Sequence, residues 1–114
     1  ILEKDRFNNL FNKYKSKLIA KCFLHDEINK NNAVSFSNNF SAKEAFSKAL
    51  GLGFRYPSYP NAIMIKRNHL GKPIITLRDE LHEYVIEKYS NYVIHLSISD
   101  TKSLSISSVI IEQI

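Results

Sequence analysis

Apolar side chains recur every three or four positions between residues 3 and 23, which is the spacing of one face of an α-helix. The members of this stripe are Phe7, Leu10, Phe11, Tyr14, Leu18 and Cys22. Four basic residues follow one flank of the stripe, and we call them the basic ridge: Arg6, Lys13, Lys17 and Lys21. The pattern predicts an amphipathic helix with a positively charged flank.

A second helix is predicted over residues 39–50. Its apolar face consists of Ala42, Ala45, Phe46, Ala49 and Leu50. Ser37 or Asn38 is the candidate N-cap, and Gly51 is the candidate C-terminal stop. Phe40 lies off the apolar face, so a monomer would leave it exposed unless the helix starts irregularly or a second surface covers it.

The rest of the chain alternates between strand and helix patterns. Residues 62–66 and 74–77 are rich in apolar and β-branched side chains and predict a hairpin with a long turn. A third amphipathic helix is predicted from Leu77, Leu81, Tyr84, Val85 and Tyr89. Residues 92–99 and 104–112 predict a second hairpin, because apolar side chains alternate along the first of them. Helices segregated from antiparallel hairpins define an α+β fold.

Composition narrows the class of protein. A chain of 114 residues and 13.2 kDa is expected to form a single domain, residues 1–114. The one cysteine, Cys22, excludes an intramolecular disulfide and any multi-cysteine metal site. No apolar run reaches the roughly 20 residues needed to span a bilayer, and the charged start does not resemble a signal peptide. We therefore expect a cytoplasmic protein with no membrane partner.

The net charge of +5 is concentrated near the start of the chain. Residues 1–24 hold six Lys or Arg against two acidic residues. A concentrated basic surface attracts nucleic acid, anionic lipid, a phosphorylated ligand or an acidic protein. A helix face that is merely solvated is the plain alternative, and charge alone does not decide between them.

Four blocks of sequence carry a specific resemblance. Residues 40–53, which read FSAKEAFSKALGLG, resemble the signature helix of the holo-acyl-carrier-protein synthases, a family of small phosphopantetheinyl transferases. Three further blocks fall in the family's order: RNHLGKP at 67–73, IHLSISD at 94–100 and SVIIE at 108–112. The resemblance covers essentially all of residues 38–114.

The resemblance implies a fold, a reaction and a metal. Members are α+β proteins in which antiparallel hairpins pack with the long helix bearing the Lys-Glu-Ala motif, and they form trimers with active sites between subunits. They move 4′-phosphopantetheine from coenzyme A to a serine of apo-acyl carrier protein with Mg²⁺, a step that supports fatty acid synthesis. Glu44 matches the family's metal ligand, and Lys48, one turn on, completes the predicted catalytic pair. Without the resemblance, Glu44 and Lys48 are an ordinary i,i+4 ion pair.

The resemblance also assigns binding residues. Those expected to contact coenzyme A are Lys43, Lys48, Gly51, Gly53, Gly71, Lys72, Pro73, Asp100 and Thr101. The basic ridge is expected to dock the acyl carrier protein, which is acidic. For Gly51, Lys72 and Asp100 the plain alternatives are a helix stop, an exposed lysine and a turn former.

The sequence departs from the family at two points. Members open with a strand whose Asp is a second metal ligand, and this chain begins after that strand, so we expect it to transfer weakly as it stands. Asn39 replaces a usual Arg. Two other functions stay open: a non-enzymatic basic module that binds RNA or an acidic protein, and a degenerate member that binds carrier protein without transfer. The aromatic residues fall mostly on core-like stripes, which disfavours RNA and predicts no nucleic-acid partner.

Overall fold

The computed structural model describes the backbone of residues 1–22 and 33–114, and the side chains of residues 1–14, 17 and 36–114. The elements in chain order are β1 (Leu2–Glu3), α1 (Lys4–Cys22), α3 (Ala33–Leu50), the 3₁₀ turn η1 (Pro60–Ala62), β2 (Ile63–Arg67), β3 (Pro73–Leu77), α4 (Asp79–Tyr89), β4 (Tyr92–Asp100) and β5 (Leu104–Gln113). The predicted α+β class and both predicted hairpins are confirmed. No helix in the described part of the chain is long and apolar enough to cross a membrane.

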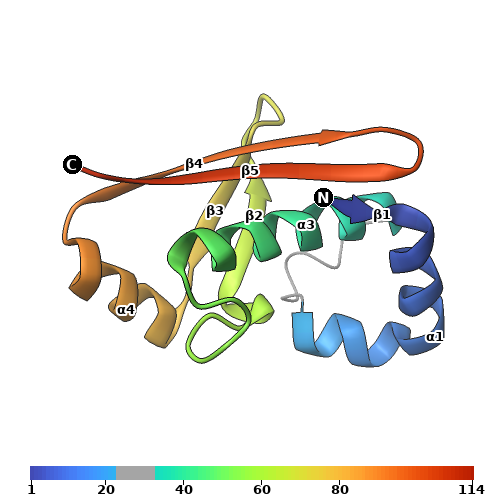
Figure 1. The fold of residues 1–114 in the computed structure, drawn as a ribbon, viewed down its shortest axis with the longest axis horizontal. Coiled ribbons are helices and arrows are strands. Elements are labelled where there is room, and N and C mark those ends of the chain that lie inside the picture. Colours follow the sequence, from blue (N-terminus) through green and yellow to red (C-terminus); the bar gives the residue numbers. More distant parts are fainter. Residues whose placement is uncertain (23–32) are drawn as a thin grey trace.

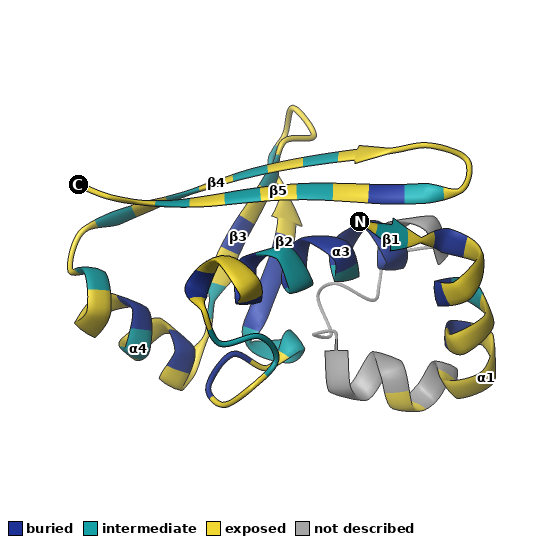
Figure 2. Cartoon of the chain, viewed as in Figure 1, coloured by how far each residue is buried: buried dark blue, intermediate teal, exposed yellow. Residues whose placement is uncertain are grey.

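The strands form two antiparallel sheets. One sheet has the order β1-β5-β4, and the other is the β2-β3 hairpin. Along β4, half-buried positions alternate with exposed ones, as the period of two predicts (Figure 2). α3 runs along the β4–β5 hairpin, and α1 and α4 lie at opposite ends of the molecule (Figure 1).

The main core gathers on the predicted apolar face of α3. Ala42, Phe46 and Leu50 pack against aliphatic side chains of β2, β3 and α4. Its buried members outside α3 are Ile63, Ile65, Ile75, Leu81 and Val85. Because this apolar face joins both hairpins and α4, it fixes the helix that carries Glu44.

α3 is longer than the sequence pattern predicts. It begins at Ala33 rather than Asn39, so the two candidate N-caps, Ser37 and Asn38, lie inside the helix. Both are buried against β5, where Ser105 hydrogen-bonds with their side chains. Polar residues that favour caps and turns can stay helical when their side chains find such partners, and this satisfaction explains why the cap prediction was wrong.

A second, aromatic cluster covers the face of α3 that the sequence analysis left unexplained. Phe7 and Phe11 of α1 pack with Phe36 of α3, and all three are buried. Phe40 is half-buried, with its ring centroid 5.5 Å from that of Phe7 and 5.6 Å from that of Phe54. The second surface that covers Phe40 therefore comes from the same chain, so Phe40 no longer argues for an oligomer.

α1 is bent rather than straight. Tyr14 has φ −123° and ψ 28°, which breaks the helical geometry, and the ribbon changes direction midway along α1 (Figure 1). Leu10 and Tyr14 are 47% and 42% exposed, so the first half of the predicted stripe buries only Phe7 and Phe11. The later stripe residues Leu18 and Cys22 have side chains outside the described residues.

Candidate functional site

Glu44 and Lys48 lie one turn apart on α3. The Lys48 ammonium is 3.3 Å from Glu44 Oε1. The Lys48 side chain is 72% exposed and the Glu44 side chain is 37% exposed. An exposed i,i+4 pair of this kind contributes only about 0.2–0.5 kcal/mol. The partly exposed Glu44 carboxylate is nevertheless open to a ligand, because a metal ion can reach it without unfolding the helix.

A cavity of about 420 Å³ lies between the start of α1 and the middle of α3, and we call it the α1–α3 cavity. Its walls are formed by Ile1, Leu2, Glu3, Arg6, Phe7, Leu10, Phe40 and Glu44. It combines an apolar wall with two carboxylates and one guanidinium. The structure thereby brings Arg6, a predicted docking residue, to the same cavity as Glu44, a predicted metal ligand.

Several residues of this cavity carry no functional signal in the sequence. Leu2 and Glu3 belong to none of the four blocks that resemble the family. Leu10 belongs to the apolar stripe that predicts the first helix. Glu3 stands far from residue 44 in the sequence, and only the pairing of β1 with β5 brings it to this place. A local pattern carries no signal for such a contact.

Lys43 is not placed to contact a ligand. Its side chain is fully buried, and its ammonium donates hydrogen bonds to the carbonyl of Pro60 at 2.8 Å and the carbonyl of Ile63 at 2.6 Å. The predicted coenzyme A contact of Lys43 is thus contradicted by its burial. Lys43 instead ties α3 to η1 and to the start of β2.

Gly51 and Gly53 close the C-terminus of α3. Their φ angles are +91° and +63°, a region that residues with a Cβ rarely adopt. The amide groups of Leu52 and Gly53 both donate to the Ser47 carbonyl, at 3.2 and 3.0 Å. Gly51 therefore is the helix stop that the sequence predicts, and a contact of either glycine with a nucleotide stays a prediction.

The turn between β2 and β3 is organised by Asn68. Its Oδ1 accepts hydrogen bonds from the amides of Leu70 and Lys72, each at 2.9 Å. Gly71 supports the turn with φ +84°, and Lys72 is exposed just before β3. The predicted block of Gly71, Lys72 and Pro73 thus presents one free-standing basic side chain at the tip of a hairpin. Whether this tip contacts coenzyme A stays a prediction.

Asp100 ends β4, and its carboxylate is engaged within the chain. The Lys4 ammonium donates to Asp100 Oδ2 at 2.7 Å and to the Thr101 carbonyl at 2.6 Å. This hydrogen bond and the positive charge of Lys4 lower the pKa of Asp100, and Asn38 and Arg67 act in the same direction. Thr101 Oγ1 accepts from the amide of Leu104 at 3.0 Å, which shapes the β4–β5 turn.

The basic ridge is divided by the bend of α1. Arg6 and Lys13 precede Tyr14, and Lys17 follows it. All three are exposed, and the Lys13 ammonium lies 5.3 Å from the centroid of the Tyr14 ring. The side chain of Lys21 lies outside the described residues. The bend therefore separates Lys17 from Arg6 and Lys13, although all three described members of the ridge are exposed, and their docking role stays a prediction.

The predicted binding residues do not all gather in one place. Among the described residues, the α1–α3 cavity is lined by Arg6 and Glu44 but not by Gly51, Gly53, Lys72 or Asp100.

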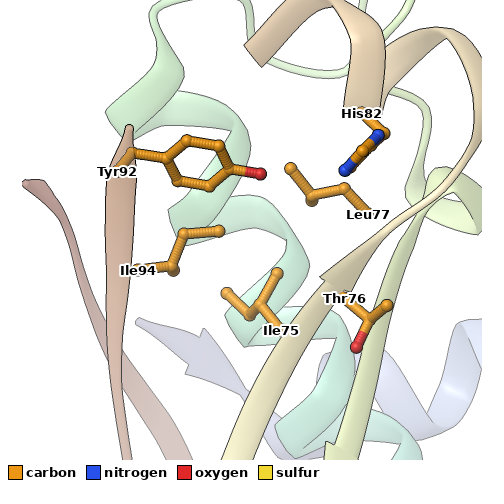
Figure 3. A pocket seen from close by; sticks show the side chains of 6 residues that line it. All are labelled: Ile75, Thr76, Leu77, His82, Tyr92 and Ile94. Atoms are coloured by element: carbon orange, nitrogen blue, oxygen red, sulfur yellow. The ribbon is translucent and has the colours of Figure 1, made fainter. Parts of the chain in front are cut away.

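A second cavity, of about 310 Å³, lies between β3, α4 and β4. In Figure 3 the Tyr92 hydroxyl points into it, with His82 across from it and Ile75, Leu77 and Ile94 forming apolar walls. Burial raises the pKa of Tyr92. None of the predicted site residues with a described side chain lines this second cavity.

The residues of the α1–α3 cavity fit a magnesium ion. Mg²⁺ binds hard oxygen ligands and keeps several waters, so one or two carboxylates and the oxygens of a substrate suffice. Glu44 supplies one carboxylate and Glu3 brings another to the same cavity. Within the described residues no three His, Cys, Asp or Glu side chains cluster as a complete metal cage. Any Mg²⁺ held here would therefore depend on substrate oxygens and water for its remaining ligands.

The fold and the sequence together place the chain in a family of small transferases. Residues 1–97 match the family model of the 4′-phosphopantetheinyl transferase superfamily, and the chain belongs to that family.

Individual relatives are more specific. The chain is 34% identical to a holo-[acyl-carrier-protein] synthase of Magnetococcus marinus, over 98% of this chain and 88% of the relative. It is 38% identical to the holo-[acyl-carrier-protein] synthase of Clostridium acetobutylicum, over 98% of this chain and 92% of that protein. These identities extend along nearly the whole chain, beyond the four sequence blocks.

Solved structures agree with the fold. The holo-[acyl-carrier-protein] synthase of Neisseria meningitidis superposes with a TM-score of 0.88 at 25% identity, covering 97% of this chain and 92% of that one. The Helicobacter pylori enzyme, solved in complex with coenzyme A, gives a TM-score of 0.84 at 26% identity, covering 97% and 95%. The predicted fold family is therefore confirmed.

Proposed function

We propose that this chain is a holo-[acyl-carrier-protein] synthase. It transfers 4′-phosphopantetheine from coenzyme A to a serine hydroxyl of apo-acyl carrier protein and releases adenosine 3′,5′-bisphosphate. The family match, the names of its relatives and the coenzyme A complex of the Helicobacter pylori enzyme support this reaction. We propose that the whole chain serves as one transferase domain.

One observation carries the proposal: Arg6 of α1 and Glu44 of α3 line the same cavity. The reaction needs a carrier protein to be held where the pyrophosphate of coenzyme A is cleaved. A guanidinium attracts an acidic carrier protein, and a carboxylate beside it can hold the cation that a pyrophosphate requires. That Arg6 and Glu44 line one cavity supports a docking role for Arg6 and a metal-binding role for Glu44 within a single site.

We assign roles to the residues of this site. Glu44 would hold Mg²⁺, which when bound neutralises charge on the pyrophosphate oxygens. Lys48, exposed one turn further along α3, would contact a phosphate. The Lys48 ammonium is 3.3 Å from Glu44 Oε1 in an exposed ion pair. Such a pair contributes little free energy, so the two side chains can give it up for contacts with the phosphate and the metal.

The coenzyme A contacts stay proposals drawn from the family blocks. We retain Gly51, Gly53, Gly71, Lys72, Pro73, Asp100 and Thr101 in this role. Lys43 is withdrawn because its ammonium is buried against carbonyl groups. On the basic ridge, Arg6 is the leading contact for the carrier protein, since it alone of the four lines the cavity among the described side chains.

We further propose a homotrimer and a cytoplasmic location. The outer face of the β4–β5 hairpin supports the trimer, because it exposes Val93, Ile106 and Ile110 at 37%, 37% and 64%. These side chains alternate with inward-facing ones along the two strands. A second copy packed on this face would bury them.

The proposed reaction is tested by mass spectrometry. Apo-acyl carrier protein is incubated with coenzyme A, Mg²⁺ and the full-length protein, and the carrier is weighed. We expect the carrier to gain one phosphopantetheine group. Glu44→Gln should slow this gain by roughly 10²–10³-fold, as expected for loss of a group that stabilises transition-state charge through its metal.

The control for Glu44→Gln is Glu83→Gln, the same substitution at an exposed position of α4. Glu83→Gln should transfer at the wild-type rate. No gain of mass with the wild-type protein would overturn the proposed reaction and leave a binding module. A Glu44→Gln protein as active as Glu83→Gln would remove Glu44 from the metal site.

A further inference from the structure

A network of polar side chains joins α1, α3, β4 and β5 beside the α1–α3 cavity. Its members Lys4, Asn38 and Ser105 are buried, whereas the Asp100 side chain is 43% exposed. Lys4, the first residue of α1, is only 6% exposed and bonds to Asp100 Oδ2 and the Thr101 carbonyl. Asn38 of α3 helps to lower the pKa of Asp100, and its Oδ1 accepts a hydrogen bond from Ser105 Oγ at 2.5 Å. Asn38 is 9% exposed and Ser105 is fully buried.

Hydroxyl groups extend this network along α3. Ser41 Oγ donates to Ser107 Oγ at 2.9 Å, and Ser37 Oγ lies 3.5 Å from Ser105 Oγ. Apolar packing tolerates small shifts, whereas buried hydrogen bonds demand particular directions and are costly to leave unmade. This part of α3 is therefore held against β5 by directional bonds, unlike its apolar face.

The network includes Lys4, which lies in the segment that forms one wall of the cavity. Lys4 stands between Glu3 and Arg6, both of which line the cavity. Its backbone amide donates to the Ser103 carbonyl at 2.8 Å, so the start of α1 is tied to the β4–β5 turn by main chain as well as side chain. The opposite wall includes Glu44, which lies on the same helix as Asn38.

We propose that the ion pair between Lys4 and Asp100 is a clamp that holds Arg6 opposite Glu44. The inference rests on the proposed function and deepens it, since it names positioning residues for that reaction. Neither Lys4 nor Asp100 touches the reacting groups in this arrangement. When the clamp is cut, the wall with Glu3 and Arg6 moves relative to Glu44, and a docked carrier serine loses its alignment with the pyrophosphate.

The first measurement is amide hydrogen exchange, which does not depend on activity. Lys4→Met keeps an unbranched side chain one atom shorter and removes its charge, and Asp100→Asn keeps the shape of its partner. Both should speed exchange at the Lys4 amide by about 10-fold, because local opening becomes easier there. Amides of the β2–β3 hairpin should be unchanged. The matched control is Lys66→Met, at an exposed position of β2.

The second measurement is steady-state transfer with the same proteins and with Lys4→Arg. We expect the clamp variants to raise KM for the apo-carrier by about 10-fold and to lower kcat as well, since misplacement by about 1 Å can cost far more. Lys4→Arg, which keeps the charge, should recover part of the loss. A purely structural pair would lower the amount of folded protein but leave KM unchanged.

The outcomes separate the two proposals. Unchanged exchange in both variants overturns the clamp. Faster exchange with an unaltered KM also overturns it, because the pair would then stabilise the fold without positioning the site. A wild-type protein that transfers nothing overturns the proposed function and the positioning role with it, while the exchange data still decide whether the network restrains the start of α1.

Discussion

The two ends of the molecule are built differently. At the α4 end, Phe46, Leu81 and Val85 are fully buried in a large cluster of mostly aliphatic side chains. At the α1 end, the buried core among the described side chains consists of three phenylalanine rings, and beside it lie a cavity and a polar network. α3 runs between the ends and contributes to both (Figure 1).

The difference separates stability from activity. A large close-packed cluster supplies most of the free energy of burial and leaves little room for a ligand. A small aromatic cluster next to a cavity supplies less, but it leaves charged side chains such as Arg6 and Glu44 where a substrate can reach them. We therefore expect substitutions at the α4 end to act on unfolding, and those at the α1 end to act mainly on transfer.

The largest expected effect is on stability at the α4 end. Phe46→Ala should lower the free energy of unfolding by about 3–5 kcal/mol, since the ring is fully buried and leaves a cavity behind. Phe11→Ala should lower the free energy of unfolding by less, because the small aromatic cluster around Phe11 can collapse toward the neighbouring cavity. Urea unfolding of both variants measures the difference. Equal losses would mean that the two clusters are equivalent supports of the fold.

A smaller effect is expected on docking at the α1 end. Arg6→Ala should raise KM for the apo-carrier by about 10-fold at low salt. The difference in KM between the variant and the wild type should shrink as salt is added, because salt screens the charge of Arg6. Lys17→Ala should do less, because Lys17 lies beyond the bend at Tyr14. Lys66→Ala, which also removes one exposed positive charge, is the control and should leave KM unchanged. Equal effects of all three would point to net charge rather than to a docking site.

The smallest effect is expected from acid. Lys4 lowers the pKa of Asp100 below its ordinary value of 3.8, so the ionised pair favours the folded state. This stabilisation is complete well above pH 3.8 and is lost as the pH falls through the lowered pKa of the folded protein. Urea unfolding of wild type and Asp100→Asn across this range should show a difference that narrows in acid. A difference in unfolding free energy that stays constant across this range would mean that the Lys4–Asp100 pair does not contribute to the pH dependence of stability.

Local pattern predicted most of the scaffold. The hairpins, the third helix and the apolar face of α3 follow from periodicity, because each buries one regular face of its element. The first turns of α3 could not be predicted, since Ser37 and Asn38 favour caps unless β5 satisfies them. The bend at Tyr14 likewise has no signal in the sequence, which contains neither proline nor glycine near that position.

The candidate site was predicted less completely. The blocks that resemble the transferase family identified Glu44 and Lys48, and charge identified Arg6. They did not reveal that Arg6 and Glu44 share a cavity, because this depends on the packing of α1 against α3. Lys43 was misassigned since its place in a familiar motif says nothing about burial, and Lys4 was overlooked because its partner stands 96 positions away.

The pairing of β1 with β5 has a consequence for the timing of synthesis. Leu2 pairs with Ser105 and Glu3 with Leu104, so during synthesis β1 has no partner until the much later β5 has emerged. The β2–β3 hairpin and its packing on α3 can form before then, because these segments are close in sequence, whereas α3 also packs on β5. We therefore expect nascent chains that lack β5 to be inert, because the α1–α3 cavity is not yet assembled in them.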